Sequence, residues 1–396
     1  MASNDAETVS PFDIAVQLFG GLSFFLYGLN KLSGSMKRLA GKRMKRVIVR
    51  LTSNPCIGLL VGMAVTGLSN SLTLVSVLLV GFVGTGLLQF ENTIPVLMGA
   101  GIGSTLISLL VALKVTKYGL LLIAVAYFYS SYAKRKRSNH SGDASAARHH
   151  SSSSGAAFDD EHEDTTALDA ADCVFDLGLI FFGSQVMGGT FAFLGTNATF
   201  VAFLERLHNP FLGLLTGFLL TVLVNSSGAA MGILLSLSEH GLLDGRAGIA
   251  MVLGANVGTC VTACLAGFSQ GRGPFEVAVA LILVRTVGAI IGTIGISGLQ
   301  YLAASVCGVS AEADLAVLAA EPGHIHPTGQ AALDVSCQIA ASHTLFNLII
   351  ALAVIPFLRP YARAVRYVVS VILRDHQKTA GSPARLPPPS LEITVV

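Results

Sequence analysis

The chain has 396 residues, of which 52% are hydrophobic and 12% charged, with a formal net charge of +2. A soluble domain averages about 25% charged residues, so this composition excludes an ordinary soluble protein and indicates a membrane protein. Uncharged runs approach or exceed the roughly 20 residues that a spanning helix needs, and no alternating strand pattern recurs to suggest a β-barrel. These runs are Leu51–Phe90, Asn92–Leu113, Leu177–Leu204, Asn209–Ser238 and Ala247–Gly271.

The sequence predicts an all-α polytopic fold with about seven full spans and two re-entrant hairpins, each hairpin being a broken helix. In chain order, the predicted elements are span Ile14–Asn30, hairpin Leu51–Phe90, spans Asn92–Leu113, Tyr118–Ala133 and Leu177–Leu194, hairpin Phe211–Ser238, and spans Ala247–Phe268, Val277–Ala304 and Val335–Phe357.

Clusters of basic residues set the predicted orientation. Eight Lys/Arg fall in Lys31–Arg50, five between Lys134 and Arg148, and six in Arg359–Arg385. Cytoplasmic loops carry the Lys/Arg excess, so these three clusters are placed inside. The N-terminus is then outside and the C-terminus cytoplasmic, and the absence of a basic n-region predicts no cleavable signal.

The loop Val306–Asp334 contains acidic but no basic residues, which suits the outside. Cys307 and Cys337 flank this loop, and a disulfide can form between them if the loop faces an oxidising space. A glycosylation sequon at Asn197 also falls on the predicted outer side.

A shift of 155 residues lays the chain on itself, and this indicates one duplicated unit. The coincidences include Asn54-Pro55 with Asn209-Pro210, Asn70-Ser71 with Asn225-Ser226, and Gly99-Ala100 with Gly254-Ala255. Each unit has an odd number of spans, so the two copies should have inverted topology, an architecture found in many secondary transporters. We therefore expect a first repeat at 1–133, a flexible cytoplasmic linker at 134–172, a second repeat with closing helices at 173–358, and a cytoplasmic tail at 359–396.

The two Asn-Ser pairs lie in the middle of apolar runs, where they predict helix breaks. A break exposes amides on one half-helix and carbonyls on the other, which suit an anion and a small hard cation respectively. Both hairpins lack charged residues, so an anion there would be held by amides, hydroxyls and helix ends. The alternative is that these small polar residues only pack helices together.

Three stretches resemble the sodium/phosphate cotransporter family, in its bacterial-type branch related to the animal type II transporters. They are "NSSGAAMGILLSLSEHGLL" followed by "MVLGANVGTCVTACLA", the entry segment "LAGKRMKRVIVRLTSNPCIGLLVGMAVT", and the closing helix "IAASHTLFNLIIALAVIPF". The resemblance runs from about Gln17 to Phe357. It implies sodium-driven uptake of inorganic phosphate by alternating access, in the plasma or inner cell membrane.

The resemblance also implies a site at the interface of the two repeats, with no cofactor other than the coupling sodium ion. The implied ligands of the anion and the ion are Asn70, Ser71, Thr73, Asn225, Ser226, Ser227, Asn256, Gly258 and Thr259. Of these, Ser71, Ser226 and Thr259 would contact sodium. Membrane lipid is the further expected partner, nucleic acid is not, and a homodimer is left open.

The chain departs from the family pattern at several polar positions. Both Gln positions are Asn, while Leu72 and Gly228 each replace a hydroxyl residue. Gly101 stands where an Asn is expected, and Arg285 takes the place of another Asn. A charge so deep in a span should face the protein interior or a cavity. We expect Arg285 either to pair structurally or to replace a lost ligand, as an anion contact or as a fixed cation in place of sodium.

Other readings of the sequence stay open at this stage. Missing ligands are compatible with transport of another small anion, or with a transport-deficient regulator derived from the family. Ser297, in a Gly-x-Ser-Gly motif, and His343 could form the dyad of an intramembrane serine protease, although the repeat does not fit that reading and no enzyme is expected. The motif Gly99–Thr105 lacks the strand and acidic partner of a nucleotide-binding loop.

Overall fold

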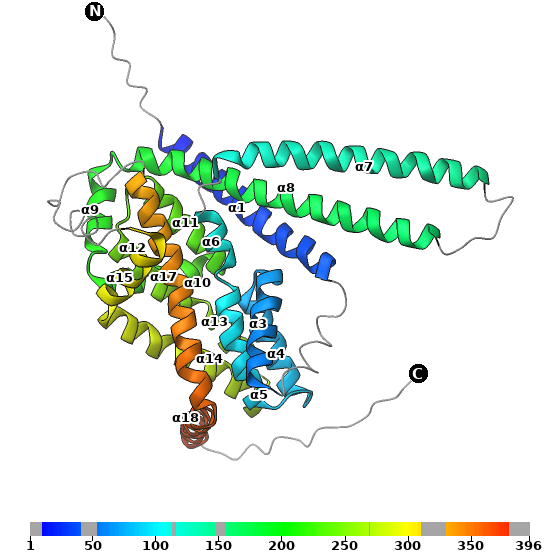
Figure 1. Cartoon of the computed structure of the whole chain (residues 1–396). Coiled ribbons are helices and arrows are strands. Elements are labelled where there is room, and N and C mark those ends of the chain that lie inside the picture. Colours follow the sequence, from blue (N-terminus) through cyan, green and yellow to red (C-terminus); the bar gives the residue numbers. More distant parts are fainter. Residues whose placement is uncertain are drawn as a thin grey trace, which may run out of the picture.

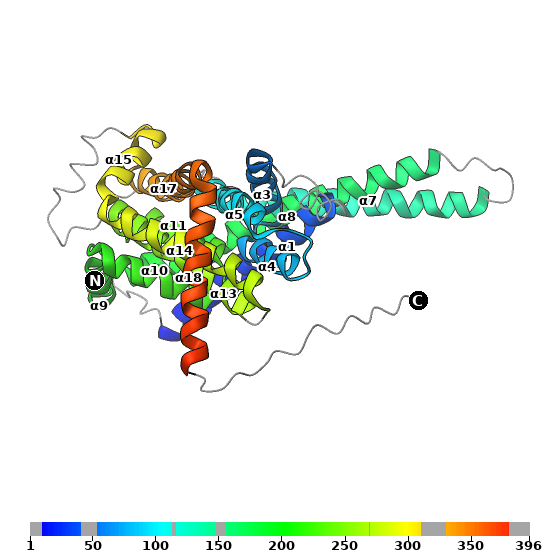
Figure 2. The ribbon, with the colours of Figure 1, turned by 90° about the horizontal axis from the view of Figure 1, so that it is seen from below.

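The computed structural model describes residues 10–40, 54–112, 116–147, 156–268, 270–309 and 330–379, and within these ranges all regular structure is helical. Figures 1 and 2 show the arrangement in two views. The helices are α1 (Pro11–Ala40), α3 (Pro55–Ser69), α4 (Leu72–Gly84), α5 (Phe90–Gly103), α6 (Leu106–Ala112), α7 (Gly119–Ala147), α8 (Ala156–Leu194), α9 (Ala198–Arg206), α10 (Pro210–Val224), α11 (Ser227–Glu239), α12 (Gly245–Gly258), α13 (Cys260–Phe268), α14 (Arg272–Ile294), α15 (Ile296–Cys307), α17 (Gln330–Val354) and α18 (Leu358–Thr379). Short 3₁₀ turns cover Thr116–Tyr118 and Ile355–Phe357.

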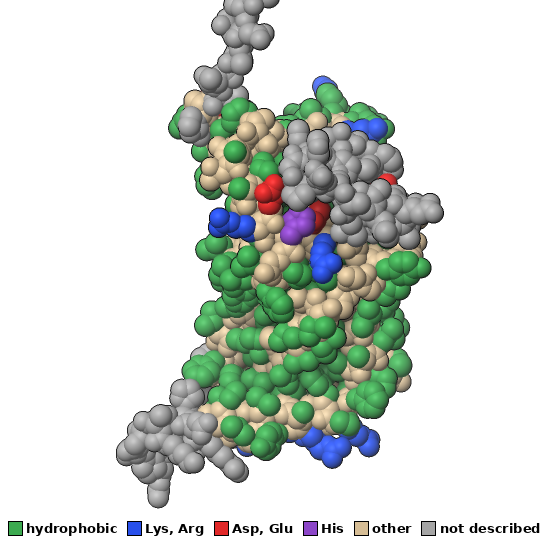
Figure 3. All heavy atoms as spheres, turned by 90° about the vertical axis from the view of Figure 1, so that its left-hand side faces the viewer, with side chains coloured by type: hydrophobic (Ala, Val, Ile, Leu, Met, Phe, Trp, Pro, Cys, Tyr) green, Lys and Arg blue, Asp and Glu red, His purple; other side chains and the backbone are tan. Residues whose placement is uncertain are grey.

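Six helical segments of the described chain are long and apolar enough to cross a membrane, and a seventh is counted if α9 and α10, bent by 109°, form one span. Figure 3 shows hydrophobic side chains across the middle of one face, with charged side chains above and below. The all-α polytopic prediction is therefore confirmed. The six segments are Phe12–Met36, Phe90–Ala112, Ala167–Leu194, Gly245–Phe268, Arg272–Ile294 and Asp334–Leu373.

The predicted span Tyr118–Ala133 lies in α7, which is not among the six segments. Its apolar part runs only from Gly119 to Ala133, about 22 Å of helix, whereas a bilayer core is about 30 Å thick. The basic cluster that begins at Lys134 then continues the same helix.

The helices around the two Asn-Ser pairs have matching bounds. Helices α3, α4 and α5 recur 155 residues later as α10, α11 and α12, with the same lengths of 15, 13 and 14 residues. The crossings match as well, because a Cβ added at Gly99 or Gly254 would lie 1.8 Å from the carbonyl oxygen of Leu59 or Leu214. Only glycine permits such close backbone contact between α3 and α5, and between α10 and α12.

The two sets of helices interleave rather than form separate bodies. Helix α4 packs on α13 and α14, while α11 packs on α6 and α17. Both α5 and α12 contact α14 and α17. The centre of the molecule is therefore the place where α5, α12, α14 and α17 meet.

The predicted flexible linker at 134–172 is largely helical in the described structure. Figure 1 shows α7 and α8 leaving the body as a long hairpin, with residues 148–155 outside the described part. Helix α1 packs along α8, and Arg38 pairs with Asp169 at 2.6 Å and Asp172 at 2.9 Å. These ion pairs and the Ala-rich composition favour helix where the sequence pattern suggested a linker. The domain boundaries stay predictions.

The predicted tail at 359–396 begins as α18, which packs on the body. Ala362, Val365 and Val369 are buried, and Arg366 pairs with Glu91 at 2.5 Å. Tyr361 donates a hydrogen bond to the carbonyl of Ala280 on α14. Residues 380–396 lie outside the described part.

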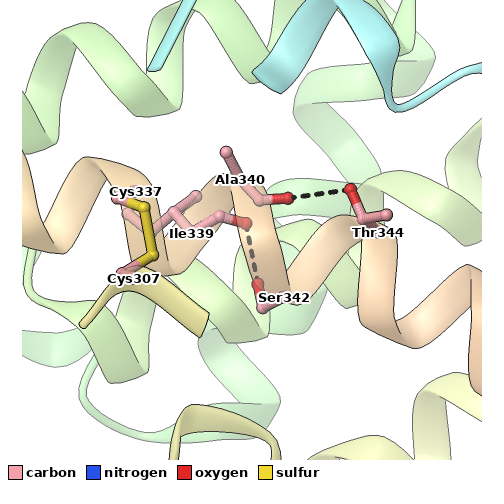
Figure 4. Close-up of a disulfide and its surroundings, with 6 residues drawn as sticks. All are labelled: Cys307, Cys337, Ile339, Ala340, Ser342 and Thr344. Atoms are coloured by element: carbon pink, nitrogen blue, oxygen red, sulfur yellow. Dashed lines mark hydrogen bonds between the residues drawn. A yellow bond between two sulfur atoms is a disulfide. The ribbon is translucent and has the colours of Figure 1, made fainter. Parts of the chain in front are cut away.

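The disulfide considered between Cys307 and Cys337 is present, with 6.1 Å between the Cα atoms. Figure 4 shows that it ties the end of α15 to the first half of α17. Further along α17, Ser342 and Thr344 each donate a hydrogen bond to a carbonyl of their own helix.

Candidate functional site

Each Asn-Ser pair breaks a helix in the same way. Asn70 (φ 48°) and Asn225 (φ 52°) are the two non-glycine residues with positive φ in the described chain. Ser71 and Ser226 then cap the next helix, each hydroxyl accepting a hydrogen bond from the amide three residues later, at 3.1 and 3.2 Å. Asn tolerates the left-handed region and Ser is a preferred N-cap, so the dipeptide ends one helix and starts the next. The predicted breaks are confirmed.

Each break lies against the C-terminal end of the following Gly-rich helix. A Cβ at Gly103 would lie 2.9 Å from the amide nitrogen of Gly67, and one at Gly258 would lie 2.9 Å from the Cβ of Thr221. Gly258 therefore packs against α10 one helical turn before the second break, and Thr259 follows it in the chain.

Several polar groups near the breaks are buried without a hydrogen-bond partner in the described structure. They include the hydroxyls of Thr66 and Thr221, which are equivalent by the 155-residue shift, and the Nδ2 of Asn70. Burying such a group unpaired costs about 1–3 kcal/mol, so these groups are available to a polar ligand.

Arg285 lies at the centre of the molecule and is 1% exposed. Its Nη1 donates to the Oδ1 atoms of Asn256, at 2.7 Å, and Asn347. The Nδ2 atoms of these two asparagines donate to the carbonyls of Val252 and His343, both four residues earlier on the same helix. Those bonds turn the amide oxygens toward the guanidinium.

A set of hydroxyl groups extends from this centre along α6 and α17. His343 Nδ1 and Ser108 Oγ are 3.2 Å apart, and Thr344 donates to Thr105 at 3.1 Å. His343 and Asn347 belong to the His-Thr-Leu-Phe-Asn motif, which the sequence assigned to the closing helix but not to the site. The sequence feature that could have identified them is a pair of polar residues one helical turn apart inside an apolar run.

The predicted site residues thus fall into two groups. Asn256 and Arg285 are in direct contact, and Gly258 and Thr259 follow on α12, where the Thr259 hydroxyl donates to the carbonyl of Asn256 at 2.8 Å. Within the described part, no hydrogen bond links either Asn-Ser pair to Arg285. The residues at the breaks are Asn70, Ser71, Thr73, Asn225, Ser226 and Ser227; Asn225 is exposed and the other five are half-buried.

The geometry does not form the serine protease dyad. Ser297 is exposed and accepts a hydrogen bond from Arg246 at 3.4 Å, whereas His343 is 3% exposed and paired with Ser108. A nucleophile and its base must lie within hydrogen-bond reach, and these two residues have other partners.

Comparison with known proteins gives consistent relatives. The family model described as Na+/Pi-cotransporter matches residues 24–147 and 179–311. An uncharacterized protein of Bacillus subtilis, YqeW, is 25% identical over 87% of this chain and 95% of its own length. The putative inorganic phosphate export protein YjbB of Escherichia coli is 20% identical over 89% of this chain and 55% of its own length.

Human sodium-dependent phosphate transport protein 2B is 35% identical over 97 residues, which is 24% of this chain and 13% of that protein. No solved structure matches the chain. The family is one of transporters rather than enzymes. Together with the family, the several apolar helices of this chain indicate a multi-pass integral membrane protein. The family model covers well over half of the sequence, so the chain belongs to the Na+/Pi-cotransporter family.

Proposed function

We propose that this protein couples sodium to the uptake of inorganic phosphate by alternating access. The single observation that carries the proposal is the matched pair of helix breaks, each with a buried, unpaired threonine hydroxyl beside it. Family membership supports a role in phosphate transport, and the breaks supply the groups that such a substrate needs.

The anion is held by amides and hydroxyls at the breaks. Helices α4 and α11 both start at a break, so their N-terminal amides and the positive end of each helix dipole face it. Thr66, Thr221 and the Nδ2 of Asn70 add donors that the fold leaves unused. A phosphate ion needs many donors and no acidic neighbour, and both hairpins lack Asp and Glu.

Sodium is held by oxygen atoms of the same region, with Ser71, Ser226 and Thr259 as proposed ligands. Hard cations prefer carbonyl, hydroxyl and carboxamide oxygens. The breaks free the last carbonyls of α3 and α10 from helical hydrogen bonds, and these oxygens add to such a set, although that of Ser69 also accepts the Ser33 hydroxyl.

The proposed orientation has the N-terminus outside and the C-terminus in the cytoplasm, with the protein in the plasma or inner cell membrane. The Cys307–Cys337 disulfide supports an outer location for the ends of α15 and α17, because disulfides persist in oxidising spaces. The Arg residues of α18 support an inner location for the other end of the molecule. With the two repeats inverted, the site would open alternately to each side.

Export of phosphate is the second candidate, because the E. coli relative that matches 89% of this chain is described as a putative inorganic phosphate export protein. The same site serves both directions, and the ion gradient decides between them.

The test is radiolabelled phosphate flux in liposomes containing the purified protein, with sodium gradients of either direction. Asn70→Gly and Asn225→Gly are the sharpest variants, because glycine keeps the left-handed backbone while removing the amide. We expect sodium-driven flux in the wild type and a reduction of about tenfold or more in each variant, as the loss of one or two hydrogen bonds to a charged ligand predicts. Gly81→Ala, on α4 with open space around it, is the control.

Flux with no sodium dependence would contradict the coupling, and unchanged flux in both variants would make the breaks structural. Sodium-driven phosphate efflux without uptake would favour the second candidate.

A further inference from the structure

The centre of the molecule contains a buried positive charge that the ion pairs of the described chain do not neutralise. Salt bridges to the acidic residues involve Arg38, His208, Arg272 and Arg366, but not Arg285. A buried charge without a counter-charge is costly, and it persists where it serves a function.

The guanidinium of Arg285 lies in the space that a side chain at position 101 would occupy. A Cβ added at Gly101 would lie 2.1 Å from Arg285 Nη2 and 2.6 Å from Asn347 Oδ1. By the 155-residue shift, Gly101 is the equivalent of Asn256, so one repeat carries an amide here and the other carries nothing. A side chain at 101 and the guanidinium of Arg285 would therefore compete for the same volume, and glycine at 101 leaves that volume to Arg285.

The groups around this charge are cation ligands in type. Two neutral carboxamide oxygens, from Asn256 and Asn347, converge on the same Nη1 atom, and each is held in that orientation by its own Nδ2 bond. Carboxamide oxygens fixed in this way would coordinate a hard monovalent cation equally well.

The geometry points to Arg285 as a resident cation that occupies the position of one coupling sodium ion between α5, α12, α14 and α17. This inference rests on the proposed sodium-coupled transport. The protein carries that charge through each transport cycle, and it therefore binds one sodium ion fewer than the same chain with amides at 101 and 285.

The first experiment measures sodium binding alone, without phosphate. The purified wild type and the variant Gly101→Asn/Arg285→Asn are melted in sodium chloride and in choline chloride of equal ionic strength. We expect the sodium-specific rise in Tm to be larger in the double variant by about 3 °C or more, because a ligand that binds only the folded state stabilises it. Gly81→Asn combined with Arg363→Asn, both away from this centre, is the matched control.

The single variants test the shared space. Gly101→Asn alone collides with the guanidinium. Arg285→Asn alone leaves a cavity and takes the donor from the Asn347 oxygen, while the Asn256 oxygen still accepts from Asn347 Nδ2 at 3.2 Å, so both should melt lower than the double variant. If the double variant does not fold, Arg285→Lys and Arg285→Met decide the question. The lysine variant should keep the sodium response of the wild type, and the methionine variant should gain sodium binding.

The second experiment is sodium-dependent phosphate flux in liposomes. We expect the Hill coefficient for sodium to be higher in the double variant than in the wild type, by at most one unit, because the coefficient cannot exceed the number of sites. Equal sodium responses in both experiments would overturn the inference, and a variant with only a raised KM for phosphate would make Arg285 an anion contact instead. A wild type that moves no phosphate would refute the proposed function, while the sodium melting comparison would still decide the role of Arg285.

Discussion

The two halves of the central core, one around α6 and α17 and the other around α13 and α14, lie beside helices of matching length and crossing. Their buried side chains differ in chemistry. Around α6 and α17, Ser108 is hydrogen-bonded to His343, and Thr105 accepts a hydrogen bond from Thr344. The positions 155 residues later, around α13, are Cys260 and Ala263. An offset of 62 residues, which sets Arg285 at the Asn of the His-Thr-Leu-Phe-Asn motif, places Leu281 of α14 opposite His343. These three residues are buried and offer only a thiol.

The same contrast holds at the centre, where Arg285 on α14 stands at the Asn position of the family pattern and Asn347 on α17, 62 residues later, keeps that amide. One half thus places neutral hydroxyl, imidazole and amide groups in the core, and the other places a fixed charge that two carboxamide oxygens accept from. The helix crossings of the two halves match, while their buried polar residues differ.

The largest expected effect concerns what the two halves share. Gly99→Val and Gly254→Val each force a side chain into a backbone carbonyl 1.8 Å from the Cβ position, so we expect losses of at least about 3 kcal/mol in both. Thermal melting and the monodisperse fraction in detergent measure this. Gly81→Ala, with nothing within 4 Å, should be neutral or slightly stabilising. A tolerated Gly254→Val with a severe Gly99→Val would show that the crossings are not equivalent.

An intermediate effect should separate the polar half from the apolar one. Ser108→Ala leaves the buried Nδ1 of His343 without its partner at 3.2 Å, and we expect a cost of about 1–3 kcal/mol. Ala263→Ser, the equivalent change in the other half, can bond its hydroxyl to its own helix and should cost below about 1 kcal/mol. Denaturant or thermal unfolding of both variants gives the difference. Equal costs would remove the asymmetry from the energetics.

The smallest effect is a pH dependence confined to the second half. His208, between α9 and α10 and outside the candidate spans, pairs with Asp244 at 2.7 Å, and that hydrogen bond raises the pKa of His208 above its usual 6.5. A raised folded-state pKa means that the stabilisation is complete below about pH 6.5 and is lost as the pH rises through the folded-state value.

Because His208 is 52% exposed, the effect should stay below about 1 kcal/mol. Tm measured from pH 5 to pH 9 should fall slightly more in the wild type than in His208→Gln. Position 53, the equivalent in the first half, is Ser53 and has no such titration. A steeper pH dependence in His208→Gln than in the wild type would reverse the assigned sign.

Parts of the site could be predicted from the sequence because they depend on local backbone preferences. Asn70-Ser71 and Asn225-Ser226 break their helices through residues that favour left-handed and N-cap conformations, and both preferences act within a few residues. Arg285 was expected to face the protein interior or a cavity because a charge in a span is costly in lipid.

Other parts depend on contacts between distant segments. Asn347 lies 62 residues from Arg285 in the chain, and no local sequence pattern predicted that the Asn347 oxygen would face the guanidinium. Ser108 and His343 are separated by 235 residues. The helix at 156–172 was also not predicted, because the acidic residues there suggested a charged linker. Asp169 and Asp172 are paired with Arg38 on α1 only in the folded structure.

By itself, the sequence determined the membrane class, the 155-residue repeat, the helix breaks and the requirement that Arg285 lie away from lipid. These follow from hydropathy, from a gapless repeat and from single-residue conformational preferences, all of which depend only on the order of residues along the chain. The tertiary structure alone decided that Gly101 makes room for a guanidinium, and that α5, α12, α14 and α17 bring Asn256, Arg285 and Asn347 together. Such contacts arise from packing across long sequence separations, where volume and hydrogen bonding are satisfied only after the helices have met.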